Sequence, residues 1–83
     1  MLSERAKAVA EKASNLYKTT LREELERTHF GAYVCIEPAS GEYFLGRSFD
    51  EAANAAMDAY PDRSTHTLRI GHAAALHLGV LVQ

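Results

Sequence analysis

The spacing of apolar residues predicts a helix over the first third of the chain. Between residues 3 and 28 they recur at steps of three and four, the spacing of one face of a helix. Gly31 follows as the expected stop signal. The face is formed by Leu2, Ala6, Val9, Ala13, Leu16, Tyr17, Leu21 and Leu25.

The pair Thr19-Thr20 leaves two interpretations of this helix open. Thr20 and Glu23 form the T-x-x-E pattern of a capping box, which would begin a second helix at this point. The unbroken stripe favours a single helix of about 26 residues, which would be about 39 Å long. Strands measure about 17–20 Å, so such a helix would overhang its sheet. A second copy of the chain would then cover the overhanging stripe.

Alternation of residue types predicts a β-hairpin after the helix. In "FGAYVCIE" (30–37), the even-numbered residues share one face and the odd-numbered residues share the other. Pro38 and Gly41 supply turn chemistry, so "EYFLG" (42–46) is interpreted as the returning strand. The odd-numbered face carries a tyrosine and a cysteine, which indicates a sheet covered at least partly on both sides.

The segment "GRSFDEAANAAMDAYPDRS" (46–64) predicts a second helix with a clear start and stop. Ser48 and Glu51 have the S-x-x-E spacing of a capping box. Pro61 ends the helix because the residue before a proline avoids helical geometry. Gly46 is interpreted as a turn glycine. The acidic residues of the first turn are therefore explained by structure, and the alanines would let the helix lie close to a sheet.

A third strand is predicted in "RSTHTLRIG" (63–71), which alternates again and ends at Gly71. The tail "ALHLGVLVQ" (75–83) predicts a final strand because its leucines and valines are in phase. The overlapping "HAAALH" (72–77) is also compatible with a helical turn.

These elements predict an α+β fold of order α-β-β-α-β-β in one domain, residues 1–83. Residues 1–29 form the helix and residues 30–83 the ββαβ(β) unit. The first two strands make an antiparallel hairpin, and the third returns beside the first. The expected result is a small mixed sheet of strand order 2-1-3.

Composition narrows the classes of partner. The net charge of −2 argues against a general affinity for nucleic acid. No apolar run approaches the ~20 residues that cross a bilayer, and the charged N-terminal stretch does not resemble a signal peptide. Cys35 is the only cysteine, so an internal disulfide is impossible, and a reducing cytoplasm is the expected compartment.

Motifs for catalysis or cofactor binding are missing from the sequence. It contains neither a phosphate-binding glycine loop nor a G-x-S-x-G nucleophile elbow. An enzyme is therefore not expected, and neither is a cofactor. The histidines lack the close spacing of zinc ligands. A small-ligand or metal site near the end of the third strand remains an alternative, using His66, His72 and His77.

Residues 34–75 resemble a family of small uncharacterised bacterial α/β proteins. These share a hairpin "I-E-x-x-S/T-G-E-Y-F-x-G", a capped helix ending in "Y-P-D" and a strand ending in "V/L-R-I-G". The resemblance implies no activity, because its motifs are structural. The matching positions are Gly41, Gly46, Ser48, Glu51, Pro61 and Gly71.

A weaker likeness is to HicB-type antitoxin domains, in which a hairpin leads to "G-x-T/S-x-x-E-A-x-x-N-A". The chain has the same residue types at the same spacing, except that its asparagine comes one position earlier. The likeness implies binding to a protein partner, since HicB-like domains mask a toxin. The positions concerned are Gly46, Ser48, Glu51, Ala52, Asn54 and Ala55.

The sequence thus favours a non-enzymatic protein-interaction module that forms a homodimer. The apolar stripe of the first helix is its expected interface, formed by Val9, Ala13, Leu16 and Tyr17.

Overall fold

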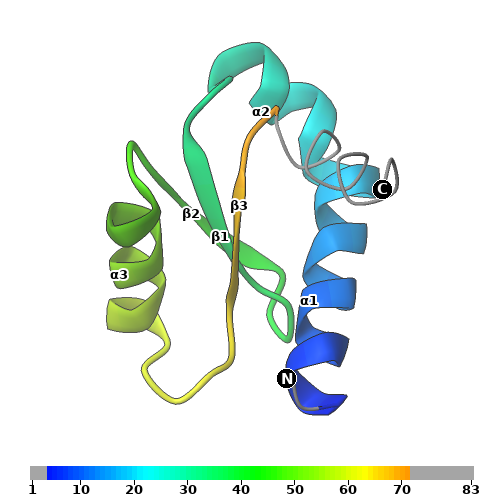
Figure 1. Cartoon of the computed structure of the whole chain (residues 1–83), viewed down its shortest axis with the longest axis vertical. Helices are drawn as coiled ribbons and strands as arrows, with labels where there is room; N and C mark the ends of the chain where they lie inside the picture. Colours follow the sequence, from blue (N-terminus) through cyan, green and yellow to red (C-terminus); the bar gives the residue numbers. More distant parts are fainter. Residues whose placement is uncertain (1–3, 72–83) are drawn as a thin grey trace, which may run out of the picture.

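The computed structural model describes residues 4–71 and places a sheet between two helical layers (Figure 1). The predicted α+β order is confirmed over this range. The expected final strand at 75–83 lies outside the described residues. The elements are α1 (Glu4–Leu16), the π-helical η1 (Tyr17–Leu21), α2 (Arg22–Thr28), β1 (Tyr33–Glu37), β2 (Glu42–Gly46), α3 (Phe49–Ala59) and β3 (His66–Arg69).

The three described strands have the predicted order β2-β1-β3. The expectation of a mixed sheet was wrong for them, because β1 pairs antiparallel with both neighbours. The reason lies in the connection through α3. It carries the chain past β1, so β2 and β3 run in the same direction but never lie side by side.

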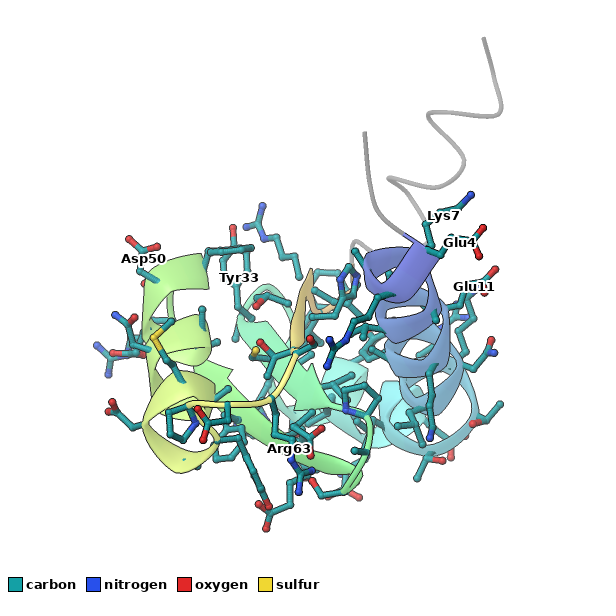
Figure 2. The ribbon with its side chains drawn as sticks, turned by 90° about the horizontal axis from the view of Figure 1, so that it is seen from below. Glu4, Lys7, Glu11, Tyr33, Asp50 and Arg63 are labelled. Carbon is teal, nitrogen blue, oxygen red and sulfur yellow. The ribbon has the colours of Figure 1, made fainter. Side chains whose placement is uncertain are left out.

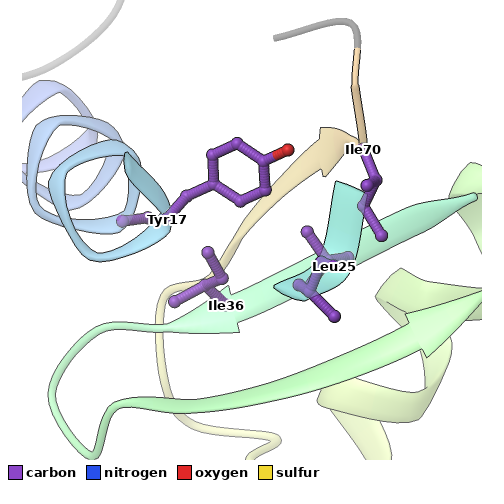
Figure 3. Close-up of a cluster of buried hydrophobic side chains, with 6 residues drawn as sticks. Tyr17, Leu25, Ile36 and Ile70 are labelled. Carbon is purple, nitrogen blue, oxygen red and sulfur yellow. The ribbon is translucent and has the colours of Figure 1, made fainter. Parts of the chain in front are cut away.

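One face of the sheet packs against α1, η1 and α2. The register places Leu45 and Leu68 on either side of Val34, so all three side chains share this face. Figure 3 shows side chains from the helices and the strands converging on one cluster. Its buried members are Ala13, Tyr17, Leu25, Val34, Ile36 and Ile70.

The opposite face packs against α3. Cys35 of β1 and the helix residues Ala52 and Ala56 are fully buried there. The small alanines permit a close approach of the helix to the sheet. At Gly46 the approach is so close that a Cβ atom would meet the backbone of Ala52. Glycine is therefore required where β2 turns into α3.

The helical path continues through Thr19-Thr20 but is not a regular α-helix there. Residues Tyr17–Leu21 form a π-helical turn between α1 and α2. The Oγ1 atom of Thr19 donates a hydrogen bond of 2.7 Å to the carbonyl oxygen of Asn15. Such bonds bend helices, and π-turns are sites of kinks. The predicted single helical segment is therefore continuous from Glu4 to Thr28, and Figure 1 shows it bending so that α2 lies across one end of the sheet.

The predicted start and stop of α3 are confirmed. Ser48 is the N-cap, and its Oγ accepts a 3.1 Å hydrogen bond from the amide of Glu51. The Glu51 carboxylate accepts from the amide of Arg47 at 2.6 Å, one residue earlier than in a standard capping box. The helix ends at Ala59, two residues before Pro61.

Three glycines within residues 4–71 adopt the left-handed conformation that other residues avoid, and two of them, Gly41 and Gly71, adjoin strands of the sheet, while the third is Gly31 after α2. Gly41 has φ +82° and closes the hairpin by donating its amide to the carbonyl of Glu37 at 2.9 Å. Gly71 has φ +85° just after β3, and a Cβ atom there would meet the ring of Phe30. Both positions therefore require glycine, as the motif pattern predicted.

Candidate functional site

The structure revises the predicted interface on the first helix. Ala13 and Tyr17 are only 0% and 2% exposed, because the sheet of the same chain covers them. Leu16 packs against this cluster, and Val9 is half-buried. In Figure 2 the labelled charged residues of α1 point away from the sheet. Ala13 and Tyr17 are therefore not available to a second copy.

The Tyr17 hydroxyl links three segments. It donates a hydrogen bond of 3.0 Å to Glu26 of α2 and accepts one of 3.2 Å from the amide of Gly71. Arg22 forms an ion pair of 3.3 Å with Glu26. Burial is the main reason why the pKa of Tyr17 is raised. This hydroxyl holds η1, α2 and the end of β3 together, which is a structural role.

His66 is the only one of the three predicted ligand-site histidines within the described residues. Its half-buried side chain faces a groove of about 380 Å³ between α1 and the start of β3. Burial lowers the pKa of His66, which favours the neutral imidazole. Residues 4–71 hold no group of three or more His, Cys, Asp or Glu side chains placed to bind a metal ion. The other groove residues are Ala6, Val9, Ala10, Ser64 and Thr65.

Glu37, the last residue of β1, is a buried carboxylate that the sequence pattern did not single out. It is 1% exposed and accepts hydrogen bonds of 2.9 Å from the amides of Ala39 and Ser40. Arg63 adds an ion pair of 3.2 Å from the loop after α3. Hydrogen bonding by Ser40 is the largest cause that holds the pKa of Glu37 below its usual value, despite burial. The sequence does contain one signal for this role: Glu37 comes immediately before the turn that begins at Pro38. A carboxylate at that position can accept hydrogen bonds from the backbone amides of the turn.

The largest exposed apolar groups that form a continuous feature lie on α3. Phe49 and Met57 are 54% and 59% exposed, and Ala53 lies between them at steps of four, on the same flank of the helix. The ring of Tyr33 meets Phe49 edge-on at 6.3 Å between centroids. We call Phe49, Ala53, Met57 and Tyr33 the α3 strip.

The surroundings of the α3 strip differ between its Tyr33 end and the opposite flank of the helix. The guanidinium of Arg69, in β3, lies 5.7 Å from the centroid of the Tyr33 ring. Glu51, on the other flank of α3, lines a small hollow with Leu45 and Gly46 beside β2. The Phe49 end of the strip is therefore connected, through Tyr33 on the central strand β1, to Arg69 of β3.

The outer margin of β3 is an unpaired sheet edge within residues 4–71. The amide of Ile70 donates to the carbonyl of Ala32 at 2.7 Å, so Leu68 and His66 also direct their backbone groups towards β1. By the same alternation, the backbone groups of Thr67 and Arg69 point outwards. Figure 1 shows β3 at the near side of the sheet with no described element in front of it.

No described helix is long and apolar enough to cross a membrane. The protein was also compared with known proteins, and neither the family models, the curated proteins nor the solved structures gave a match. The two family resemblances noted in the sequence therefore stay predictions, and function is inferred from the geometry.

Proposed function

We propose that the protein is a non-enzymatic protein-interaction module that self-associates. The observation that carries this proposal is the exposed α3 strip, whose Phe49 end is connected through Tyr33 to β3, the strand whose outer margin is unpaired within residues 4–71. Aromatic residues and methionine are enriched in protein interfaces. Burying one large apolar side chain contributes about 1.5–3 kcal/mol, so covering both Phe49 and Met57 would favour association.

The polar groups that could suggest chemistry have structural partners. Glu37 is held by two loop amides and Arg63, and the Tyr17 hydroxyl bridges Glu26 and Gly71. A general acid or base must reach a substrate proton. Groups engaged in this way inside the fold favour a binding role over a catalytic one.

The HicB-like pattern adds a second protein as a possible class of partner for this cytoplasmic module. That pattern includes Ser48 and Glu51, which cap the helix carrying the α3 strip. A toxin-masking role would use the same exposed surface. Self-association remains the part of the proposal that can be tested with the purified chain alone.

The test is the mass in solution, measured by sedimentation equilibrium over about 1–100 µM. We expect twice the chain mass of 9.1 kDa. Met57→Glu places a charge in the α3 strip and should weaken the dimer. Asn54→Glu is the matched control, because it adds the same residue to an exposed position of α3 outside the strip. A wild-type chain that stays monomeric throughout would contradict the proposal.

A second candidate function is small-ligand or metal binding in the groove beside His66. The specific observation in its favour is a half-buried imidazole facing about 380 Å³ of space. Calorimetric titration with Zn²⁺ tests the metal form, with His66→Ala as the comparison. Equal heats for both proteins would exclude His66 as a ligand.

A further inference from the structure

We infer that the partner in self-association is a second copy whose β3 pairs antiparallel with β3 of the first. This inference rests on the proposed function and assigns its interface. Each copy contributes the three strands of residues 4–71, so these strands would form one continuous sheet of six across the dimer. The two copies would be related by a two-fold axis, the commonest symmetry of homodimers.

The backbone of β3 determines the register in which the β3 strands of the two copies would pair. Thr67 and Arg69 are the residues of this strand whose amides and carbonyls point away from β1. With the two-fold axis at Leu68, Thr67 of each copy lies opposite Arg69 of the other. Both outward residues then exchange their backbone hydrogen bonds. No arginine faces another arginine directly, which avoids a destabilising like-charge pair.

The arrangement on the α3 face of the sheet favours a second folded copy as the partner of β3, and not a single peptide strand. A two-fold axis normal to the sheet places both α3 helices on the same face. The Phe49 end of each α3 strip is connected through Tyr33 to Arg69 of β3, so the two ends would approach each other across the new pair of strands. Phe49, which is more than half exposed in one chain, would then gain apolar neighbours.

The residues on the other face of the sheet, which α1 covers, also favour a second copy as the partner. There Leu68 packs against the main core, and the groove lined by Val9 and Ala10 of α1 lies beside Thr65 and His66. The axis would bring the two Leu68 side chains together on this face. A second copy supplies a helical layer on both faces of the sheet, whereas a peptide strand supplies neither.

Charge complementarity also favours a second copy. Arg69 lies at the end of β3 where α3 begins, beside Tyr33 and Phe49. In the antiparallel dimer that end faces the C-terminal half of the other α3. The last turn of α3 has no basic residue, and a helix C-terminus attracts cations. Nor does β3 carry the proline or lysine that commonly protects an edge strand from pairing.

The decisive variant is Thr67→Pro. Proline removes an amide that the single chain does not use in its ladder with β1, and it blocks pairing at the outer margin. Thr67→Val is the matched control, since it keeps the amide and the branched side chain. We expect sedimentation to give a dimer for the wild type and Thr67→Val, and at least a ten-fold larger dissociation constant for Thr67→Pro. Circular dichroism melting shows whether each variant is folded.

A cross-link gives independent evidence should Thr67→Pro fail to fold. Leu68 would form a non-hydrogen-bonded pair across the axis, with Cα atoms about 4.5 Å apart. A disulfide spans about 4.4–6.8 Å, so Leu68→Cys should oxidise to a covalent dimer. The wild type is the control, because its own Cys35 is buried.

Each alternative gives a different result. A dimer that survives Thr67→Pro, with no cross-link in Leu68→Cys, would overturn the β3 interface while leaving self-association intact. A monomeric wild type would overturn both proposals.

Discussion

Replacing Glu37 with glutamine tests whether this carboxylate fastens the hairpin loop to the loop after α3. Glutamine keeps the shape but offers only one acceptor oxygen, so the amides of Ala39 and Ser40 cannot both be satisfied. A hydrogen bond to a charged group contributes about 1.5–3 kcal/mol. The pair with Arg63 adds little, because the Arg63 side chain is half exposed. The expected loss is about 2 kcal/mol.

Such a loss would be a large part of the free energy of unfolding, about 4–12 kcal/mol for a domain of this size. The melting temperature should fall by about 8–16 °C. Urea unfolding at pH 7 measures the free energy directly. Glu11→Gln is the matched control, since it removes one negative charge from an exposed position of α1.

The effect should also depend on pH. The pKa of Glu37 in the folded chain lies below the usual 4.5, so the ionised form stabilises the fold. This contribution is complete above about pH 5 and is lost as the pH falls through the lowered pKa. The difference between wild type and Glu37→Gln should therefore narrow from pH 7 to pH 3. A difference below about 0.5 kcal/mol at pH 7, or one that stays constant with pH, would refute this reasoning.

Three further predictions concern the fold. Tyr17→Phe leaves the amide of Gly71 without its partner and should cost about 1–3 kcal/mol in urea unfolding; an unchanged midpoint would contradict this. Gly46→Ala should lower the melting temperature, because its Cβ meets the backbone of Ala52; equal melting would show that α3 can shift. Burial lowers the pKa of His66, so the imidazole should titrate by NMR with a midpoint below 6.5. Its protonation should then destabilise the fold as the pH falls. A midpoint at or above 6.5 would show that burial does not lower the pKa of this imidazole.

Local signals predicted the order of the elements because each one is encoded in a short stretch. The cap at Ser48, the turn glycine Gly41 and the glycine after β3 act over a few residues, and the structure confirms all three. The strand order followed from the tight hairpin and the helical connection. The expected mixed sheet is not found among β1, β2 and β3, because β2 and β3, which run in the same direction, both pair with β1 and not with each other.

Long-range packing could not be predicted in the same way. An apolar stripe has the same spacing whether its own sheet or a second chain covers it, so Ala13 and Tyr17 were assigned to an interface. The burial of Glu37 depends on Arg63, which is far away in the sequence. The α3 strip was not predicted, because the alanines of this helix indicated only the side that packs on the sheet.

The π-turn at Tyr17–Leu21 sets the relative phase of the helices before and after it. An α-helix advances about 100° per residue, so a regular helix would place Leu25 about 80° around the axis from Tyr17; the wider turn takes up one additional residue and reduces this offset. Tyr17 and Leu25 reach the same cluster from helices that run in different directions. Deleting one threonine of the turn would place Leu25 seven residues after Tyr17, about 700° along a regular α-helix, so both side chains would stay on nearly the same face. Straightening the turn without a deletion would instead direct Leu25 away from the core. The π-turn therefore lets this segment hold one residue more than a regular helix would permit.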